Sequence, residues 1–247
     1  MKNLFLFLFF VAYASFAIAQ DNDSTSVKRK NVFKFLPVNI PFQSNSFEYE
    51  RMINAKNSFT LGIGLANQQS LIGKYGIDAG SDLKSADLGT SHIRVAFRHY
   101  GGSKRNLPRG FYIEPYVKYQ KITGSATVQN TNTTDPYSGK VDIDVNTMNF
   151  GFQLGAQFLI AKRVTLDFYF LGLEAGVMSG NVTAVSDQLA QADNLKADIE
   201  KSIKDLPAFI GDKLTVTQST DKKTIGIKAS SVPYPWLRGG ISIGIAF

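Results

Sequence analysis

The sequence predicts an all-β protein: a closed up-and-down antiparallel transmembrane β-barrel of about eight strands, with one amphipathic helix in its last outer loop. Three observations predict this fold. Segment after segment alternates apolar with polar or small residues at period two, which is the signal of a strand. The connections between these segments alternate between short and long, as expected when turns lie on one rim and loops on the other. Charges and glycines gather on one face of several strands, which suits the crowded interior of a small barrel.

The first residues have the form of a secretory signal. Lys2 gives a positive start, 4–14 is nearly unbroken apolar sequence, and 17–19 (Ala-Ile-Ala) is a small-x-small cleavage site. The apolar stretch is too short to cross a bilayer as a helix. We therefore expect export across the inner membrane, and location in the cell outer membrane. The chain divides into a signal peptide at 1–19, a polar linker at 20–30 and a barrel at 31–247, with an outer loop and helix at 177–236.

The composition excludes several classes of protein. The chain has 27 Lys and Arg against 20 Asp and Glu, and removal of Lys2 leaves 26 minus 20, a charge of +6. Because the basic residues are scattered, we expect no nucleic-acid partner; contact with outer-membrane lipid and lipopolysaccharide phosphates is the expectation instead. There is no cysteine, so neither a disulfide framework nor a lipid-modified cysteine is possible. No metal spacing or phosphate loop occurs, and no metal or other cofactor is predicted.

Eight strands are expected, each bounded by clusters of Gly, Asn, Pro or Ser. Their even number places both chain ends on the periplasmic rim. Pro37 and Pro115 fall inside strands, and because each removes a backbone donor we expect a bulge at both positions. The expected strands lie at about 32–40, 47–53, 58–66, 91–100, 110–122, 144–159, 163–176 and 237–247.

The two faces of these strands indicate a membrane protein. A Lys or Arg facing lipid costs about 2–4 kcal/mol at the bilayer midplane, so the charges opposite the apolar face must point inward. Burial then requires that they pair, which fills the lumen. The tyrosines and tryptophan expected in an aromatic girdle are Tyr49, Tyr100, Tyr112 and Trp236. The expected interior charge network is Lys34, Glu48, Glu50, Arg94, Arg98, Glu114, Lys118, Asp167 and Arg238.

These features resemble a known family. With its signal segment, its alternating strands and a last strand ending in Phe247, the chain resembles the small outer-membrane barrels typified by the OmpA transmembrane domain and OmpX. In that family the terminal aromatic is read by the barrel-assembly machinery, so the resemblance implies an assembly signal at Ile241, Ile243, Ile245 and Phe247. Segments 47–51 (FEYER) and 58–64 (SFTLGIG) are also similar to the DUF3575-like barrels common in Bacteroidota. The resemblance implies no shared catalytic residues.

The last outer loop carries an apolar stripe. Its spacing of three or four residues predicts one amphipathic helix capped by Ser186 or Asp187. We expect this helix to be a lid over its own barrel, with the leaflet surface or a protein partner as alternatives. After it, 214–218 and 224–228 are expected to form a hairpin or to extend the last two strands. The stripe consists of Leu189, Leu195, Ile199, Ile203, Leu206 and Ile210.

The leading functional hypothesis is a non-enzymatic barrel with a plugged lumen and a structural or adhesive role, or a place in an envelope complex. A second hypothesis is a lipid-modifying enzyme in the same barrel, for which Ser91 and His92 are the only Ser–His pair along a strand. Glu48 and Glu50 fit a structural ion pair better than a carboxylate pair for catalysis, because basic residues are expected beside them. A soluble, lipocalin-like periplasmic binding protein is the third.

Overall fold

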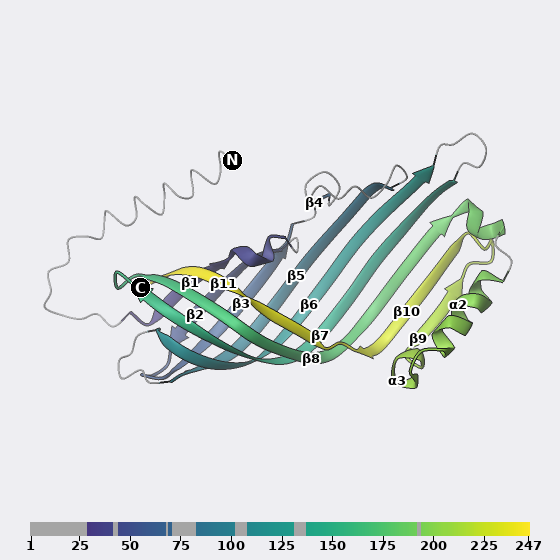
Figure 1. Cartoon of the computed structure of the whole chain (residues 1–247). Coiled ribbons are helices and arrows are strands. Elements are labelled where there is room, and N and C mark those ends of the chain that lie inside the picture. The colour runs from purple at the N-terminus through teal and green to yellow at the C-terminus, as the bar shows by residue number, and fades with distance from the viewer. Residues whose placement is uncertain are drawn as a thin grey trace, which may run out of the picture.

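The computed structural model describes residues 29–41, 44–67, 69–70, 83–101, 108–130, 137–191 and 194–247. The expected signal peptide and most of the expected linker lie outside these ranges. The described chain is predominantly strand and forms one antiparallel sheet (Figure 1). The strands are β1 Asn31–Leu36, β2 Ser44–Met52, β3 Asn57–Ala66, β4 Gln69–Ser70, β5 Leu83–Tyr100, β6 Gly110–Asn130, β7 Tyr137–Ile160, β8 Val164–Ser186, β9 Leu214–Gln218, β10 Thr224–Pro233 and β11 Trp236–Ala246.

In the part of the chain that the structure describes, four short helical segments accompany the sheet. None of the helices in the described ranges is long and apolar enough to cross a membrane. They are the 3-10 turns η1 Pro37–Asn39 and η2 Asp187–Gln191 and the α-helices α2 Leu195–Lys204 and α3 Ala208–Gly211.

Eight of the strands form a closed ring. Neighbours follow the order β11, β1, β2, β3, β5, β6, β7, β8, and β11 also pairs with β8, which closes the circle. At the seam between first and last strands, Val32 lies opposite Ala246 and Phe35 opposite Ile243. The backbones of Asn31 and Phe247 exchange two N–H to oxygen hydrogen bonds, of 3.1 and 2.9 Å. The prediction of an all-β, antiparallel structure is therefore confirmed.

The two rims of the ring differ. The ends of β2, β5 and β7 and the starts of β3, β6 and β8 lie on the rim that also holds the start of β1 and the end of β11. A three-residue turn joins β7 to β8, and in it Ala161 and Lys162 have φ values of 48° and 59°. The predicted alternation of short and long connections holds only in part: β1 and β2 are joined by 37–43 and β6 and β7 by 131–136, both shorter than 101–109 between β5 and β6, because much of the sequence expected in long loops is strand.

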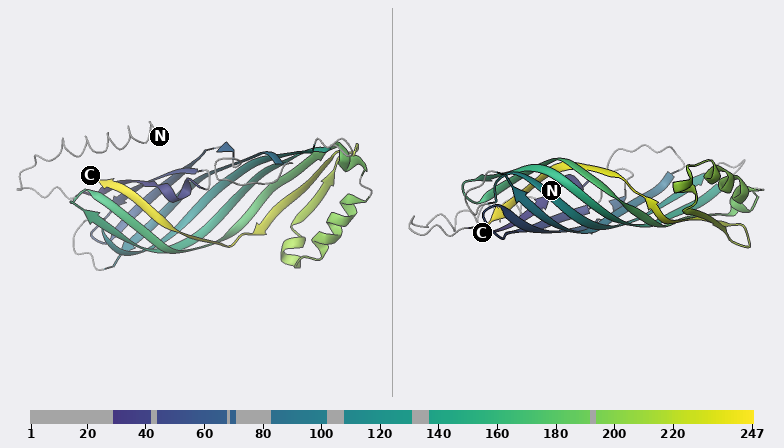
Figure 2. Two further views of the ribbon diagram at one scale, coloured as in Figure 1. Left: turned by 45° about the horizontal axis from the view of Figure 1, so that its top comes forward. Right: turned by 90° about the horizontal axis from the view of Figure 1, so that it is seen from below.

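Four strands continue far beyond that opposite rim. β5 starts at Leu83, β6 runs to Asn130, β7 starts at Tyr137 and β8 runs to Ser186, so each is longer than predicted. β10 pairs with this part of β8 and β9 pairs with β10, which builds an open sheet, here called the extension (Figures 1 and 2). Much of the expected outer loop is thus strand, because ladder pairing satisfies its backbone without the apolar alternation of the ring.

The helical segment departs from the single helix that was predicted. Ser186 is the last residue of β8, only a 3-10 turn follows it, and α2 begins at Leu195. Pro207 separates α2 from α3, since proline has no backbone N–H to continue a helix. α2 lies against β9 and α3 against β10, so the expected lid instead packs on a hairpin of its own chain, at the end of the molecule opposite the C-terminus (Figure 2). The expected hairpin of 214–218 and 224–228 is present.

An ion pair connects the turn of this hairpin to the segment that directly follows β8. The Lys223 ammonium donates to the Asp187 carboxylate at 2.8 Å, and this hydrogen bond raises the pKa of Lys223. Next to it the Ser219 hydroxyl and the Lys223 backbone N–H both donate to Asp221, which lowers the pKa of that carboxyl. The turn between β9 and β10 therefore keeps its charges at neutral pH.

The two prolines do not form bulges. β1 ends at Leu36, and Pro37 opens the turn η1, where its fixed φ and missing N–H cost nothing. Pro115 stays in register opposite Phe152, with only a local interruption of hydrogen bonding to β5. A bulge occurs instead at Phe170, which has no partner between Leu154–Leu171 and Gly155–Tyr169.

Gly176 offers a test of close strand packing. A Cβ atom there would overlap the backbone oxygen of Met148 and lie 2.7 Å from the Cα of Asn149. We expect Gly176→Ala to lower the free energy of unfolding by about 1–3 kcal/mol, because backbone cannot move aside cheaply. Gly139→Ala is the control, since its added Cβ would meet atoms at 3.5 Å, and we expect a change within about 0.5 kcal/mol. Denaturant titration of the refolded protein measures both; equal values would contradict the packing.

Candidate functional site

The interior of the ring is lined by ionisable side chains. All nine residues expected in the charge network face inward, from β1, β2, β5, β6, β8 and β11. Eight of them are buried, and the side chain of Arg238 keeps 15% of its surface exposed. Every second residue of each strand points inward. Since the ring is closed, inward residues from strands far apart in sequence meet in its interior.

Lys34 is the centre of the deeper part of this network, near the rim with the short turns. Its ammonium lies 3.0 Å from Glu48, 2.8 Å from Glu50 and 3.0 Å from Asp167. A lysine has three donors, and here each can face a different carboxylate. One side chain of β1 thereby connects β2 to β8 across the ring.

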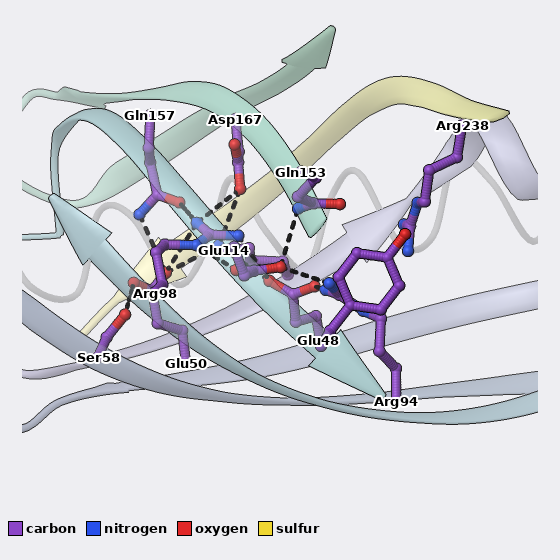
Figure 3. A network of polar contacts seen from close by, with 12 residues as sticks. Glu48, Glu50, Ser58, Arg94, Arg98, Glu114, Gln153, Gln157, Asp167 and Arg238 are labelled. Atoms are coloured by element: carbon purple, nitrogen blue, oxygen red, sulfur yellow. Dashed lines mark hydrogen bonds and ion pairs between the residues drawn. The ribbon is translucent and has the colours of Figure 1, made fainter. Parts of the chain in front are cut away.

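Two arginines of β5 complete the deeper part (Figure 3). Arg94 pairs with both Glu48 and Glu114. Arg98 pairs with Glu114 and, at 2.9 Å, with Asp167. Each guanidinium thus spans two carboxylates from different strands, which its forked geometry favours.

Neutral side chains satisfy the remaining carboxylate oxygens. The Tyr100 hydroxyl donates to Glu50 at 2.6 Å, and the Tyr112 hydroxyl donates to Asp167 at 2.7 Å. The Arg98 guanidinium also lies 3.7 Å from the centre of the Tyr112 ring. The interior donors that complete the set are Ser58 to Glu50, Gln153 to Glu114 and Gln157 to Glu50.

Tyr100 and Tyr112 were expected in an outward aromatic girdle, and that expectation is wrong. Both are buried, at 0% and 4% exposure, because they share the parity of the inward residues on β5 and β6. Of the other two candidates, Trp236 is half exposed and the Tyr49 hydroxyl donates to Asn31 at 2.7 Å.

A second part of the network, nearer the opposite rim, depends on a residue that sequence reasoning missed. Glu174 is 4% exposed and pairs with Lys118 at 2.5 Å and, more loosely, with Arg238 at 4.0 Å. It also accepts hydrogen bonds from Tyr116 at 2.9 Å and Asn149 at 3.2 Å. The bulge at Phe170 shifts the alternation of β8 by one residue and turns Glu174 inward.

Glu174 changes the charge balance. Lys34, Arg94, Arg98, Lys118 and Arg238 give five cations, while the sequence pattern supplied only four anions. With Glu174 the count is five against five, so the ten side chains sum to zero. The deeper part of the network has three cations and four anions, and the part around Glu174 has two cations and one anion.

The structure does not bring together the Ser–His pair. His92 lies opposite Gln120 on the inward side of β5, and its ring covers Gly64. Ser91 is the preceding residue of the same strand, so its side chain points to the other face. In the described part of the chain no group of three or more His, Cys, Asp or Glu could hold a metal ion.

The residues expected as an assembly signal lie on an outer surface, while the predicted apolar stripe is half-buried at Leu189, Leu195, Ile199, Ile203 and Ile210 and exposed only at Leu206. Ile241, Ile243, Ile245 and Phe247 are between 37% and 58% exposed on β11 and at its end. No residue of α2 is buried, and Leu206, in the turn after it, is 41% exposed. Comparison of the chain with protein-family models, with curated proteins and with solved structures finds no match.

The network predicts a stability difference between buried and exposed pairs. We expect Arg98→Met to lower the free energy of unfolding by about 3–5 kcal/mol, because it leaves Glu114 and Asp167 short of a partner in a buried site. Lys140→Met is the control: Lys140 pairs with Asp142 at 2.8 Å on the surface, where such a pair contributes about 0–1 kcal/mol. Urea unfolding monitored by circular dichroism measures both. A loss below about 1 kcal/mol for Arg98→Met would show that the network does not stabilise the ring.

Proposed function

We propose that the ring is a β-barrel that spans the bacterial outer membrane, with its lumen closed by the charge network, and that the protein is a non-enzymatic component of the cell envelope. The proposal includes membership of the small outer-membrane barrels that the sequence resembles, and an export signal at 1–19. Its role is structural or adhesive, or that of a subunit of an envelope complex, with the extension as the part offered to a partner.

The observation that carries this proposal is the inverted distribution of side chains. The ions are inside the ring, while large apolar side chains cover its outside. Soluble proteins rarely expose a contiguous apolar surface of more than a few hundred Å², whereas lipid requires one. The exposed apolar residues include Phe59, Leu61, Ile63 and Leu65 on β3, Ile93, Val95 and Phe97 on β5, Phe111, Ile113 and Val117 on β6, Phe150 and Phe158 on β7, and Ile241, Ile243 and Ile245 on β11.

Seven of the eight ring strands are long enough to cross a bilayer, while β1, with six residues, is shorter. A membrane-spanning strand needs about 9–11 residues. β3 has 10 residues and β11 has 11, whereas β6, β7 and β8 have 21, 24 and 23. The longer strands therefore continue well beyond the apolar zone. With the short turns in the periplasm, the extension and its helices project from the outer face of the membrane.

The two other hypotheses have less support. A soluble lipocalin-like protein would turn its apolar side chains inward around a ligand, the reverse of this arrangement. A lipid-modifying barrel needs a nucleophile beside its base, and Ser91 and His92 occupy opposite faces. The closed lumen and the elaborate extension favour a binding or structural role over transport.

Two valines test the membrane placement. Val95 lies on the outside of the ring and Val182 on the extension, with similar exposures of 41% and 36%. In a bilayer, Val95→Arg should lower the free energy of unfolding by about 2–4 kcal/mol, because it places a charge in hydrocarbon. Val182→Arg, outside the bilayer, should change it by no more than about 0.5 kcal/mol. The measurement is denaturant unfolding in phospholipid vesicles; equal effects of the two substitutions would refute the placement.

The closed lumen predicts an absence of channel activity. Reconstituted into planar bilayers, the detergent-purified protein should give no steps approaching those of an open porin, because Arg94, Arg98 and Glu114 bridge the interior. The lumen of an eight-stranded barrel has room only for side chains or one small ligand. A porin-like conductance that persists after the protein is repurified would contradict a sealed barrel.

A further inference from the structure

A cavity of about 390 Å³ lies at the rim of the ring from which the extension leaves. Its walls come from η1, β2, β5, β6, β8, the start of β11 and the segment that joins β10 to β11. It is here called the mouth cavity, and its characteristic residues are His92, Lys118, Tyr169, Tyr234, Trp236 and Arg238. The volume falls in the range of small-molecule sites, about 300–1,000 Å³.

The floor of the mouth cavity carries a positive charge. Lys118 and Arg238 both line it, and they share the single carboxylate of Glu174. Together they form the part of the network with two cations and one anion. The deeper part has the opposite imbalance, so positive charge is concentrated toward the cavity.

Arg238 has donors to spare. Its closest contact with an anion is the 4.0 Å approach to Glu174, too long for a hydrogen bond. Otherwise, within the described chain, its guanidinium rests on the rings of Tyr116 and Tyr169, 5.4 and 4.9 Å from their centres. A guanidinium has five N–H donors suited to a carboxylate or phosphate.

The upper walls are apolar and aromatic. Tyr234 and Trp236 stack with their ring planes 6° apart and their centres 5.8 Å apart. Leu88, Ile122 and Leu237 add aliphatic surface. Such a wall favours a ligand with an apolar body, while the cationic floor selects an acidic end.

We propose that the mouth cavity binds a small organic monoanion, with its acidic group on Arg238 and Lys118 and its apolar or aromatic body against Tyr234 and Trp236. This site is distinct from the sealed part of the network and does not depend on placement of the ring in a membrane. One excess positive charge matches one negative charge on the ligand.

Trp236 is the only tryptophan of the chain, so its fluorescence reports on the mouth cavity. The probe is phenylacetate, compared with 2-phenylethanol and 2-phenylethylammonium, which have the same aromatic body without the negative charge. Titrated into the detergent-solubilised full chain, phenylacetate should give a saturable change with a Kd at least about tenfold lower than either analogue. Equal responses to the three compounds would overturn the proposal.

Substitutions then locate the site. Arg238→Gln should raise the Kd for phenylacetate about tenfold or more, and Arg238→Lys should raise it less. Arg51→Gln is the matched control, because Arg51 is exposed at the opposite rim and bonds Asn31, and its Kd should stay within twofold of the parent. If circular dichroism shows that Arg238→Gln does not fold, Lys118→Gln takes its place. An unchanged Kd in the folded variant would refute the assignment.

Discussion

Neutralisation of charge inside a closed ring is the constraint on which the rest of the structure depends. Moving an ion out of water costs several kcal/mol, and attraction to a partner offsets this only when geometry and hydrogen bonding are good. The ring meets the constraint with five cations, five anions and a set of tyrosine, glutamine and serine donors. Because nearly every ion touches partners on two or more strands, the network also fixes how the strands are placed around the circle.

The ring itself could be predicted from the sequence to a useful degree. Where apolar residues alternate with polar or small ones, as from Phe59 to Leu65, the period of two predicts both the strand and which of its side chains face outward. The same parity assigns Tyr100 and Tyr112 to the interior, although their residue type suggested an outer girdle. For these two tyrosines, position along the strand predicts the side-chain direction better than the general preference of tyrosine for an outer girdle.

Other features depend on information that periodicity does not carry. The extension is built from Thr, Ser, Asp and Val without a sustained apolar face, so its strands are recognisable only once their partners are known. Glu174 was missed because one unpaired residue, Phe170, reverses the alternation after it. The change was visible as neighbouring apolar residues at 170 and 171, but a bulge of this kind is decided by the strands on either side.

The seam between β1 and β11 has a consequence for biogenesis. Asn31 and Phe247 are separated by almost the whole described chain, yet their backbones are bonded to each other. Contacts between residues so distant in sequence form slowly, because a large loop must close before they contribute. Until β11 arrives, β1 and β8 both present unpaired edges of the kind that aggregate. In a chain with this topology, the period of greatest exposure to aggregation therefore ends only when the C-terminal strand pairs with the first.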